Sequence, residues 1–339
     1  MGNPSCTCFK CRRERDRSPS DVYVPCCADM VSLLYVVYDA AMTLPLIHII
    51  IVLYNSSDTF ATMWRSLAAQ TCGDWRLIAI DNNSADNSAS MLRALSDSRL
   101  HVIENKENVG FARAVNQGLR IAAEQGAERC LLLNPDTVLP ADFLKDLISA
   151  WTKHDWLVVA PRIMCTEAPS QSWYAGGYLD YGWLFSNQHD DFSPNDTPDP
   201  REVDFASGCC MGLSMEALRR VGLLDESFFV YWEDTDYCVR LKTAGIPIMY
   251  LRDPMLLHEG GASSDGTFSP AGVKLFYSSY ALMLRKHFGM RKTLRMAFRI
   301  LWREHANKNK DPGHVRRVAA SLWHGLRRPI LPEPRLPTR

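Results

Sequence analysis

Three groups of acidic and imidazole side chains, far apart in the sequence, are the residues best suited to chemistry. Asp136 lies in LLLNPDTVLP, Glu233 and Asp234 lie in VYWEDTD, and His258 lies in LRDPMLLHEGG. A hard carboxylate such as Asp136 is well suited to hold a divalent cation that carries phosphates. Histidine is a common metal ligand, and an excess of acids at a helix start indicates a working carboxylate. The groups predict one site if the fold brings them together.

Each group also has an ordinary structural explanation. Asn134-Pro135-Asp136 is a turn sequence in which the aspartate can cap the turn. Acidic residues in the first turn of a helix interact with its dipole, although three acids within the four positions from Glu233 exceed what a cap requires. A lone histidine is more often a satisfied surface residue than a ligand, although His258 is followed by the flexible pair Gly260-Gly261.

Strand and helix patterns alternate between Leu46 and Trp151. Apolar runs of strand length lie at residues 46–54, 76–81, 100–105 and 130–134. Amphipathic helix patterns follow them at residues 59–70, 86–95, 110–125 and 141–151. This alternation predicts an α/β fold with a mostly parallel, doubly wound (Rossmann-like) sheet.

Polar residues follow each predicted strand, at the edge where sheets of this kind bind ligands. They are Tyr54, Asn55, Asp81, Asn82, Asn83, Glu104, Asn105, Asn134 and Asp136. Pro135 can end its strand there without costing a ladder hydrogen bond. Asp81 and Asn83 also suit a turn and the N-cap of the helix expected from Asp86.

The second half of the chain has a weaker pattern. Residues 172–202 are rich in Gly, Asp, Asn and Pro, which predicts a mobile loop over the site. We expect a short helix at residues 214–221 and another from Trp232. The run IPIMYL predicts a strand that leads toward His258.

Composition and charge limit the class of protein. The 339 residues are 47% hydrophobic and 22% charged, which is typical of a soluble globular chain with a large core. The net charge is zero, yet from Arg285 onward fifteen Lys/Arg stand against three Asp/Glu. No uninterrupted apolar run is long enough to cross a membrane, and the N-terminus lacks the apolar region of a signal peptide. The eleven scattered cysteines favour a reducing compartment, so we expect a cytoplasmic protein.

The leader, residues 1–44, stands outside the alternating pattern. Its cysteines are Cys6, Cys8, Cys11, Cys26 and Cys27. Their spacing is not that of a standard zinc finger, so we expect a disordered leader, with zinc binding as the alternative. The sequence also allows a functional chain that begins near Met42.

An ordered set of motifs between Leu46 and Gly289 resembles family 2 glycosyltransferases with the GT-A fold, most closely their bacterial rhamnosyltransferase branch. The motifs are VLYNS, IDNNSADNS, NVGFARAVNQG, LLLNPDT, GCCMGLSMEALRRVGLLDESFFVYWEDTDYCVRLKTAG and LHEGGAS. We therefore expect the catalytic domain at residues 45–290, with the leader and a tail at residues 291–339 outside it.

The resemblance implies a role for each matched position. Asp81 matches the acid that contacts the nucleotide base in the family, and Arg113 matches a position that approaches the nucleotide. The other donor-binding positions are Tyr54, Asn55, Asn83 and Asn134. Asp136 is the metal-binding end of an Asp-x-Asp motif whose first acid is replaced by Asn134, which lowers the charge at the metal by one.

The Glu-Asp motif and the later histidine complete the implied site. By the resemblance, Asp234 would be the catalytic base, with Glu233 before it, and His258 would join the metal shell. The implied reaction is an inverting transfer of a sugar from a nucleotide-sugar donor, favoured to be dTDP-L-rhamnose, to a hydroxyl of a cell-surface polysaccharide or lipid-linked glycan. The implied cofactor is Mg²⁺ or Mn²⁺, and the imidazole mildly favours Mn²⁺. A homo-oligomer is also compatible with the sequence.

Two other functions compete with glycosyl transfer. A nucleotidyltransferase would show a Gly-rich phosphate loop and a basic residue after its first strand, and VLYNSSD has neither. A sugar-nucleotide-binding relative without activity is disfavoured because Glu233, Asp234 and His258 are all present.

The basic tail predicts amphipathic helices. LMLRKHFGMRKTLRMAFRILWREH and VRRVAASLWHGLRRPILP interleave apolar residues with Arg and Lys at helical spacing. Such helices can lie on an anionic membrane surface, or pack on the catalytic domain or a second subunit. We favour a peripheral position on the cytoplasmic face of the membrane, because an acceptor carried on a polyprenyl lipid requires it. No nucleic-acid recognition motif accompanies the charge, so we expect no nucleic-acid partner.

Overall fold

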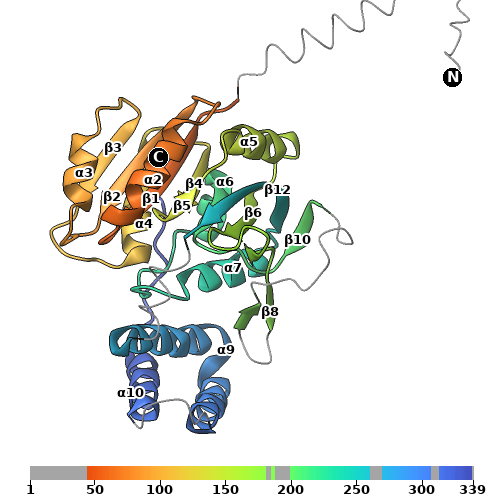
Figure 1. The fold of residues 1–339 in the computed structure, drawn as a ribbon. Coiled ribbons are helices and arrows are strands. Elements are labelled where there is room, and N and C mark those ends of the chain that lie inside the picture. Colours follow the sequence, from red (N-terminus) through yellow and green to blue (C-terminus); the bar gives the residue numbers. More distant parts are fainter. Residues whose placement is uncertain (1–43, 181–184, 188–198, 260–268, 307–312, 338–339) are drawn as a thin grey trace, which may run out of the picture. The chain divides into compact units, whose positions relative to one another are not determined.

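The computed structural model describes residues 44–180, 185–187, 199–259, 269–306 and 313–337 (Figure 1). The leader with its five cysteines lies outside the described residues, except for Leu44. From Leu44 onward the chain forms one compact unit.

The first half of this unit has the predicted alternation of strands and helices. Its elements are β1 (Ile47–Leu53), α2 (Ser57–Ala68), β2 (Trp75–Asp81), α3 (Ser88–Ala94), β3 (Leu100–Glu104), α4 (Phe111–Glu124), β4 (Arg129–Leu133), β5 (Thr137–Val138) and α5 (Phe143–Lys153). Every residue of β1 is buried, because helices cover both faces of the sheet there. The predicted elements are confirmed, with ends displaced by a few residues.

The second half contains more strands than the sequence indicated. Its elements are β6 (Val158–Cys165), β7 (Ser172–Tyr174), β8 (Tyr178–Asp180), β9 (Phe185–Asn187), β10 (Arg201–Val203), β11 (Cys210–Ser214), α6 (Met215–Val221), α7 (Glu233–Thr243), β12 (Ile248–His258), α9 (Pro270–Ala306) and α10 (His314–Arg327). Residues 172–202, where the sequence predicted a mobile loop, contain four short strands in their described part, the last of which ends at Val203. Short polar strands carry too little hydrophobic pattern to be recognised alone.

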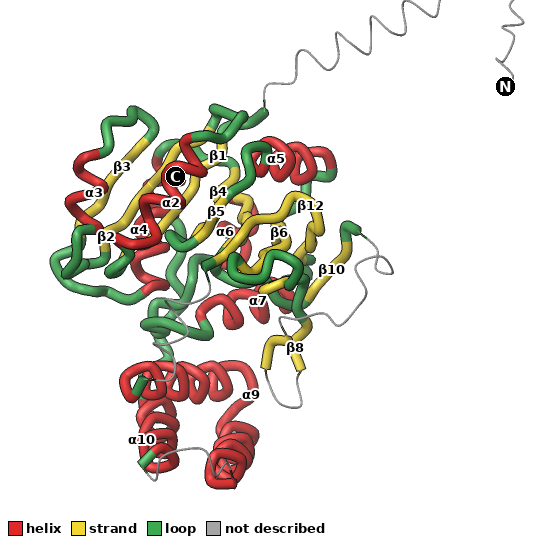
Figure 2. The backbone as a smooth tube through the Cα atoms, in the orientation of Figure 1, coloured by secondary structure: helices red, strands yellow, loops and turns green. Residues whose placement is uncertain are grey.

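The main sheet is mixed, and its mixed order positions the site. Among the described residues its order is β10-β12-β6-β11-β4-β1-β2-β3, with β5 beside β12 and β7 beside β6 (Figures 1 and 2). Strands β3, β2, β1 and β4 are parallel, as predicted. Strand β11 runs antiparallel between β4 and β6, so Cys210 at its start pairs with Leu133 at the end of β4. The loop before β11 therefore arrives at the edge where the parallel strands end.

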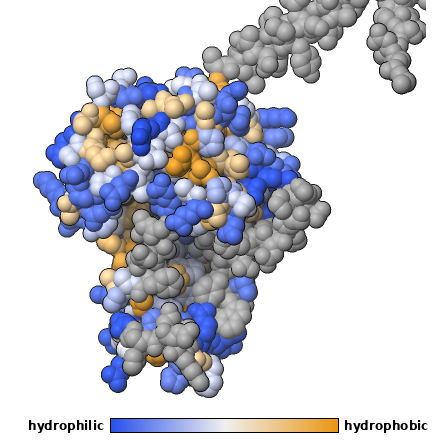
Figure 3. Space-filling model, viewed as in Figure 1, coloured by the Kyte–Doolittle hydropathy of each residue, from blue (hydrophilic) through white to orange (hydrophobic). Residues whose placement is uncertain are grey.

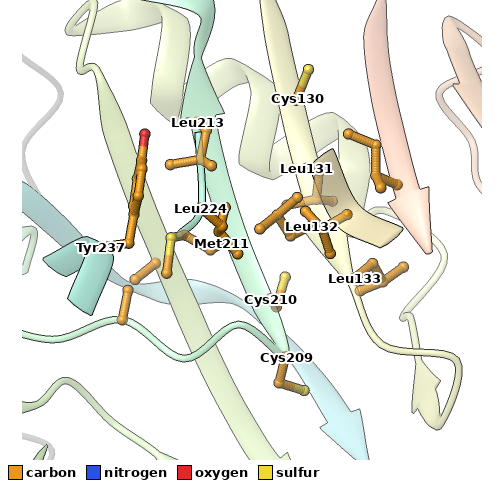
Figure 4. Close-up of a cluster of buried hydrophobic side chains, with 14 of the residues drawn as sticks. Cys130, Leu131, Leu132, Leu133, Cys209, Cys210, Met211, Leu213, Leu224 and Tyr237 are labelled. Atoms are coloured by element: carbon orange, nitrogen blue, oxygen red, sulfur yellow. The ribbon is translucent and has the colours of Figure 1, made fainter. Parts of the chain in front are cut away.

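Packing rather than local propensity makes β11 a strand. Its sequence CMGLS has no β-branched residue, yet all five residues are buried. At Gly212 a Cβ atom would lie 2.5 Å from Val159 and 2.8 Å from Trp151, so only glycine fits between these neighbours. Figure 4 shows the hydrophobic side chains that β4 and β11 contribute, together with Leu224 and Tyr237.

The tail forms helices, as predicted. Helix α9 bends at Gly289, where φ is 75°, and the predicted domain boundary at residue 290 falls beside this bend. Helix α10 packs closely on the first half of α9: a Cβ atom at Gly325 would lie 2.1 Å from the carbonyl oxygen of Ser278. None of the helices in the described ranges is both long enough and apolar enough to cross a membrane.

After α10 the chain returns to the α/β body. The carbonyl oxygen of Pro334 accepts a hydrogen bond of 2.9 Å from the backbone of Leu223, and Arg328 donates to the carbonyl oxygen of Ser227. The C-terminal segment thus contacts the loop that leads into α7. The visible surface of the body is mostly hydrophilic, with scattered hydrophobic residues (Figure 3).

Candidate active site

Asp136 and His258 meet at the carboxyl edge of the sheet. After β4, Asn134 and Pro135 form a turn in which the Thr137 hydroxyl donates to the Asn134 carbonyl oxygen over 2.8 Å. Strand β5 then pairs with the end of β12, so that Thr137 lies opposite His258. This pairing places His258 Nε2 3.2 Å from Asp136 Oδ2. Asp136 therefore lies in a turn and beside His258, but its Oδ1 accepts no hydrogen bond from the described residues with which it could cap that turn.

Several buried polar atoms at this edge make no hydrogen bond with any described residue. They are Asp136 Oδ1, both ring nitrogens of His258, Asp81 Oδ1 and Glu233 Oε2. Although His258 Nε2 is near Asp136, its geometry is not that of a hydrogen bond. A buried polar atom without a partner costs free energy, so such a group of atoms indicates a place where a ligand binds.

The residues present fit a divalent cation that shares its shell with a substrate. Within the described part of the chain, no cluster of three or more His, Cys, Asp or Glu side chains could enclose an ion. Asp136 and His258 provide two ligands, and Mg²⁺ is commonly held by one or two carboxylates together with substrate phosphates and waters. Trp173, which the sequence reasoning missed, packs its ring 4.5 Å from the His258 ring between centroids.

Glu233 and Asp234 open helix α7 on a strained piece of backbone. Tyr231 and Trp232, which precede them, have φ values of 66° and 73°. Residues other than Gly, Asn and Asp rarely have such φ values, and backbone strain of this kind is concentrated at functional sites. Asn55 and Asn83, two of the predicted site residues, also have positive φ.

Two adjacent residues, Gly208 and Cys209, connect the Glu233-Asp234 pair to the turn that contains Asp136. The Gly208 amide donates to Asp234 Oδ2 over 3.2 Å, and the Cys209 carbonyl oxygen accepts from the Asn134 amide over 2.9 Å. Burial and the nearby Asp136 carboxylate together raise the pKa of the Cys209 thiol well above its ordinary value. The loop before β11 therefore brings Asp136, His258 and Asp234 to one region. Gly208 was missed because nothing in the sequence shows which strand its loop precedes.

The acid pair has an unusual electrostatic environment. Burial, and then the charge of Asp234, raise the pKa of Glu233 to about 8. Asp234 is only half-buried by surface area, but desolvation raises the pKa of its carboxyl group despite hydrogen bonds from Gly208 and Thr235. Burial thus raises the pKa of both groups, and repulsion from Asp234 raises that of Glu233 further, so each ionises at a higher pH than an exposed carboxyl group.

The predicted donor-binding residues lie at the ends of β1 and β2. Leu53 pairs with Asp81 in register, so Tyr54 and Asn55 follow one strand beside the residues that follow the other. Asp81 is buried and its Oδ2 accepts from the Ser84 amide, whereas Tyr54 is 52% exposed.

The structural alternative for Asp81 and Asn83 is correct for the turn, where the Ser84 amide donates to Asp81 Oδ2 over 3.1 Å, but wrong for the helix cap. Helix α3 begins only at Ser88, and its N-cap residue is Asn87. Asp86 instead accepts from the Ser57 and Ser88 amides, both over 2.9 Å. The side chains of Asp81 and Asn83 are thus not used as helix caps.

Arg113 lies on the first turn of α4, which begins next to Gly110. At Gly110 φ is 86°, and a Cβ atom would lie 2.5 Å from the Phe229 carbonyl oxygen, so glycine allows this close approach. The Arg113 side chain is 53% exposed and forms an ion pair of 3.2 Å with Glu226. Its guanidinium is accessible from solvent but already has one anionic partner.

Comparison with known proteins identifies the class of enzyme. The profile of the family described as Glycosyl transferase family 2 matches residues 48–222. The chain belongs to that family. The matched segment contains Asp81, Arg113 and Asp136 but ends before Glu233 and His258. Family membership makes this protein a glycosyltransferase, and it favours glycosyl transfer over the nucleotidyl transfer considered above.

Curated relatives of this glycosyltransferase act in glycan synthesis, according to their names. A low-salt glycan biosynthesis hexosyltransferase of Haloferax volcanii, Agl10, is 27% identical over 70% of this chain and 71% of its own length. The dTDP-rhamnosyl transferase RfbF of Shigella flexneri is 24% identical over 82% of this chain and 86% of its own. An N-acetylglucosaminyl-diphospho-decaprenol L-rhamnosyltransferase of Mycobacterium tuberculosis is 22% identical over 71% and 85%. The rhamnosyltransferase-like assignment is thereby confirmed.

Solved structures confirm the fold of the glycosyltransferase. The mannosyltransferase PcManGT of Pyrobaculum calidifontis, in complex with GDP-Man and Mn²⁺, matches with a TM-score of 0.51 and 17% identity, over 87% of this chain and 82% of its own. The fold is GT-A, as predicted, with a mostly parallel mixed sheet and a C-terminal helical extension.

Proposed function

We propose that this glycosyltransferase moves L-rhamnose from dTDP-L-rhamnose to a hydroxyl group of a lipid-linked glycan or cell-surface polysaccharide, with inversion at the anomeric carbon. One observation carries the proposal: the Asp136–His258 pair and the Asp234 carboxylate lie on either side of Gly208 and Cys209. One carboxylate is then available at the donor diphosphate while a second remains for proton transfer. The names of the Shigella and Mycobacterium relatives support the choice of rhamnose.

Asp234 is proposed as the base of a single displacement. The acceptor oxygen forms a bond to the anomeric carbon while the bond from that carbon to the diphosphate breaks, and the acceptor proton moves to Asp234. A carboxylate with a raised pKa is a stronger base, which the direction of the Asp234 pKa supports. Hydrogen bonds from the Gly208 and Thr235 amides orient the carboxylate. One displacement inverts the configuration of the sugar.

Asp136 and His258 are proposed to hold Mg²⁺ or Mn²⁺. Their unpartnered atoms and the 3.2 Å between Asp136 Oδ2 and His258 Nε2 support two ligands on one ion. Mn²⁺ is present in the mannosyltransferase complex that shares the fold, and an imidazole ligand favours it mildly over Mg²⁺. When bound, the ion would neutralise charge that develops on the leaving diphosphate.

The donor nucleotide is proposed to bind at the ends of β1, β2 and β4. Asp81, with one unpartnered carboxylate oxygen, is assigned to the base, and the exposed Tyr54 ring offers a face for it. The remaining contacts are assigned to Asn55, Asn83, Arg113 and Asn134. Arg113 can contact the nucleotide only if its guanidinium either is shared between the nucleotide and Glu226 or breaks its ion pair with Glu226.

A panel of sugar nucleotides tests the donor and the stereochemistry. Metal-stimulated hydrolysis of each donor is measured without acceptor, and the product of transfer to a soluble acceptor is examined by NMR. We expect the highest rate with dTDP-L-rhamnose and an inverted anomeric configuration. Preference for another sugar nucleotide would reject rhamnose, and a retained configuration would reject Asp234 as the base.

Removal of the proposed ligands tests the metal site. In Asp136→Ala and His258→Ala we expect nucleotide binding to lose its dependence on added Mn²⁺, measured by calorimetric titration with and without the ion. Glu128→Ala is the matched control, because Glu128 is 77% exposed and precedes the opposite end of β4. An unchanged dependence on Mn²⁺ in Asp136→Ala would remove this residue from the metal shell.

The acceptor is proposed to be presented at the cytoplasmic face of a membrane. The Mycobacterium relative is named for an acceptor on diphospho-decaprenol, and the C-terminal tail of this chain is strongly basic. Basic helices are attracted to anionic lipid surfaces. Transfer to a lipid-linked acceptor in vesicles, compared with transfer to the same sugar in solution, measures this preference.

A further inference from the structure

The second half of α9, residues 290–306, exposes a stripe of large hydrophobic side chains. The exposed fractions are 46% for Met290, 51% for Leu294, 68% for Phe298 and 69% for Trp302. Residues four positions apart lie one above the other on a helix, so the four side chains form one continuous stripe. Single exposed hydrophobic residues are common on soluble proteins, but an aligned group that includes two aromatic residues indicates an interaction surface.

A stripe of arginines runs beside the hydrophobic one. Arg291, Arg295, Arg299 and Arg303 each follow one of the hydrophobic residues by one position and all are exposed. Arg291 and Arg295 form no ion pair with any residue that the structure describes. The one acidic residue of this stretch, Glu304, is buried and forms an ion pair of 3.0 Å with Arg303, which leaves Arg291 and Arg295 uncompensated by it. The exposed face is therefore hydrophobic and positively charged at the same time.

Buried contacts hold this half of the helix in a defined orientation. Glu304 accepts a hydrogen bond of 3.1 Å from the Tyr277 hydroxyl and lies 3.1 Å from His314 Nε2. These contacts connect the second half of α9 to its first half and to α10. Met296 and Ile300 on the same side are also buried. The exposure of Phe298 and Trp302 thus results from a fixed orientation and not from a helix that lacks contacts.

We propose that this face, formed by the hydrophobic stripe and the arginine stripe, docks on an anionic lipid bilayer. An amphipathic helix parallel to a membrane inserts its apolar side chains at the boundary of headgroups and acyl chains, while its basic residues contact anionic headgroups. Arginine and tryptophan both suit this depth, because each joins an apolar part to a polar end. A second copy of the chain is a poor partner for the same face, because Arg291 and Arg295 of one copy would repel those of the other.

The biological role that we assign to docking depends on the proposed function, but lipid binding by this face does not. If the acceptor is lipid-linked, docking by this face would bring the transferase to the surface that carries the acceptor. The binding itself involves no sugar and no metal, so it can be measured independently of catalysis. Figure 3 shows hydrophobic residues among hydrophilic ones on the visible part of the helical extension, some of which is behind residues drawn in grey.

Co-sedimentation with vesicles tests the proposal on the full chain. We expect binding to vesicles that contain phosphatidylglycerol, much weaker binding to phosphatidylcholine alone, and release at high salt. Phe298→Ser with Trp302→Ser should weaken binding at least about 100-fold, since burying each of the two side chains contributes more than the 1.4 kcal/mol that equals a factor of ten. Arg291→Gln with Arg295→Gln should weaken it about 20- to 30-fold, at about 1 kcal/mol for each charge.

Matched controls separate this face from general charge and hydrophobicity. Leu46→Ser removes a hydrophobic side chain that is 41% exposed on the α/β body, and Arg65→Gln removes an exposed arginine of α2; both variants should bind like the wild type. Donor hydrolysis should be unchanged in all four variants, which would show that each variant folds. A variant that hydrolyses the donor but does not bind vesicles has lost docking and not the proposed reaction.

Two results would overturn the proposal. One is equal vesicle binding by the wild type and the Phe298→Ser/Trp302→Ser variant. The other is a lipid-free oligomer, measured by light scattering, that the same variant converts to a monomer, because the face would then be an interface between copies of the chain.

Discussion

Three carboxyl groups lie in the first turn of α7, and the surroundings of Glu233 and Asp234 differ from those of Asp236. Glu233 and Asp234 are desolvated and form no ion pair with a cation in the described part of the chain, and the pKa of each is raised. Asp236, which is fully buried, lies 2.8 Å from both Lys286 Nζ and Arg240 Nε and 2.7 Å from His287 Nε2. Burial alone would raise its pKa, but these partners outweigh burial and hold the pKa of Asp236 well below its ordinary value.

The difference shows how one helix turn provides both a reactive and a structural carboxylate. Lys286 and His287 belong to α9, and Lys286 also contacts Asp225 before α7. The first half of α9, together with Arg240, thus compensates Asp236, whereas Glu233 and Asp234 lie next to each other without such partners. A carboxylate without a compensating cation keeps its affinity for a proton, which general-base catalysis requires.

The largest expected effect comes from Asp234→Asn. Transfer should fall by about 10²- to 10⁴-fold, because the base can no longer accept the proton, whereas donor binding measured by titration should persist. Asp204→Asn, which alters a carboxylate in a surface ion pair with Lys242, is the control. Turnover close to that of the wild type would show that the uncompensated carboxylate is not the base.

Lys286→Met tests the compensated side of the comparison. The substitution leaves buried Asp225 and Asp236 short of a cation, which should lower the free energy of unfolding by about 3–5 kcal/mol, measured by urea denaturation. Adding Asp225→Asn to this variant should recover part of the loss. A decrease no larger than that of a surface ion pair would mean that Lys286 does not compensate these carboxylates.

The pH dependence of stability should have opposite signs for Glu233 and Asp236. The folded pKa of Glu233 is raised from 4.5 to about 8, so its contribution to stability is present below pH 4.5 and is lost as the pH rises to about 8. The folded pKa of Asp236 is lowered from 3.8, so its contribution is present above pH 3.8 and is lost as the pH falls. Urea denaturation of Glu233→Gln should accordingly show less loss of stability between about pH 4.5 and 8 than the wild type.

The same variant sharpens the kinetic comparison. In the wild type, transfer should increase with pH as the carboxyl groups of Glu233 and Asp234, whose pKa values are both raised, become ionised. In Glu233→Gln the like charge beside Asp234 is absent, so the increase should move to lower pH. An identical pH profile in both proteins would contradict electrostatic coupling between the two carboxyl groups.

The smallest expected effect is that of Lys242→Met. Lys242 pairs with Asp204 at the surface, where its side chain is 51% exposed. Solvent screens such a pair, so the free energy of unfolding should change by at most about 1 kcal/mol. If Lys242→Met lowered the free energy of unfolding as much as Lys286→Met does, burial would not determine how much each lysine contributes to stability.

The parallel half of the sheet could be predicted from sequence because its signals are local. Residues such as Ile47–Leu53 are apolar throughout and are followed by amphipathic helices, so pattern and position agree. Strand β11 and the short strands from Ser172 to Val203 could not be recognised. Their conformation depends on neighbours that are distant in the chain, as Gly212 between Val159 and Trp151 illustrates.

The sequence by itself determined which side chains are capable of chemistry: the types, order and spacing of Asp136, Glu233, Asp234 and His258 follow from it directly. Only the tertiary structure decided which of them meet and in what state. The β5–β12 pairing joins Asp136 to His258, and the reversed strand β11 carries Gly208 to Asp234. Cations from α9 neutralise one acid of α7 but not its neighbours, and burial and charge of this kind come from long-range contacts that no local pattern encodes.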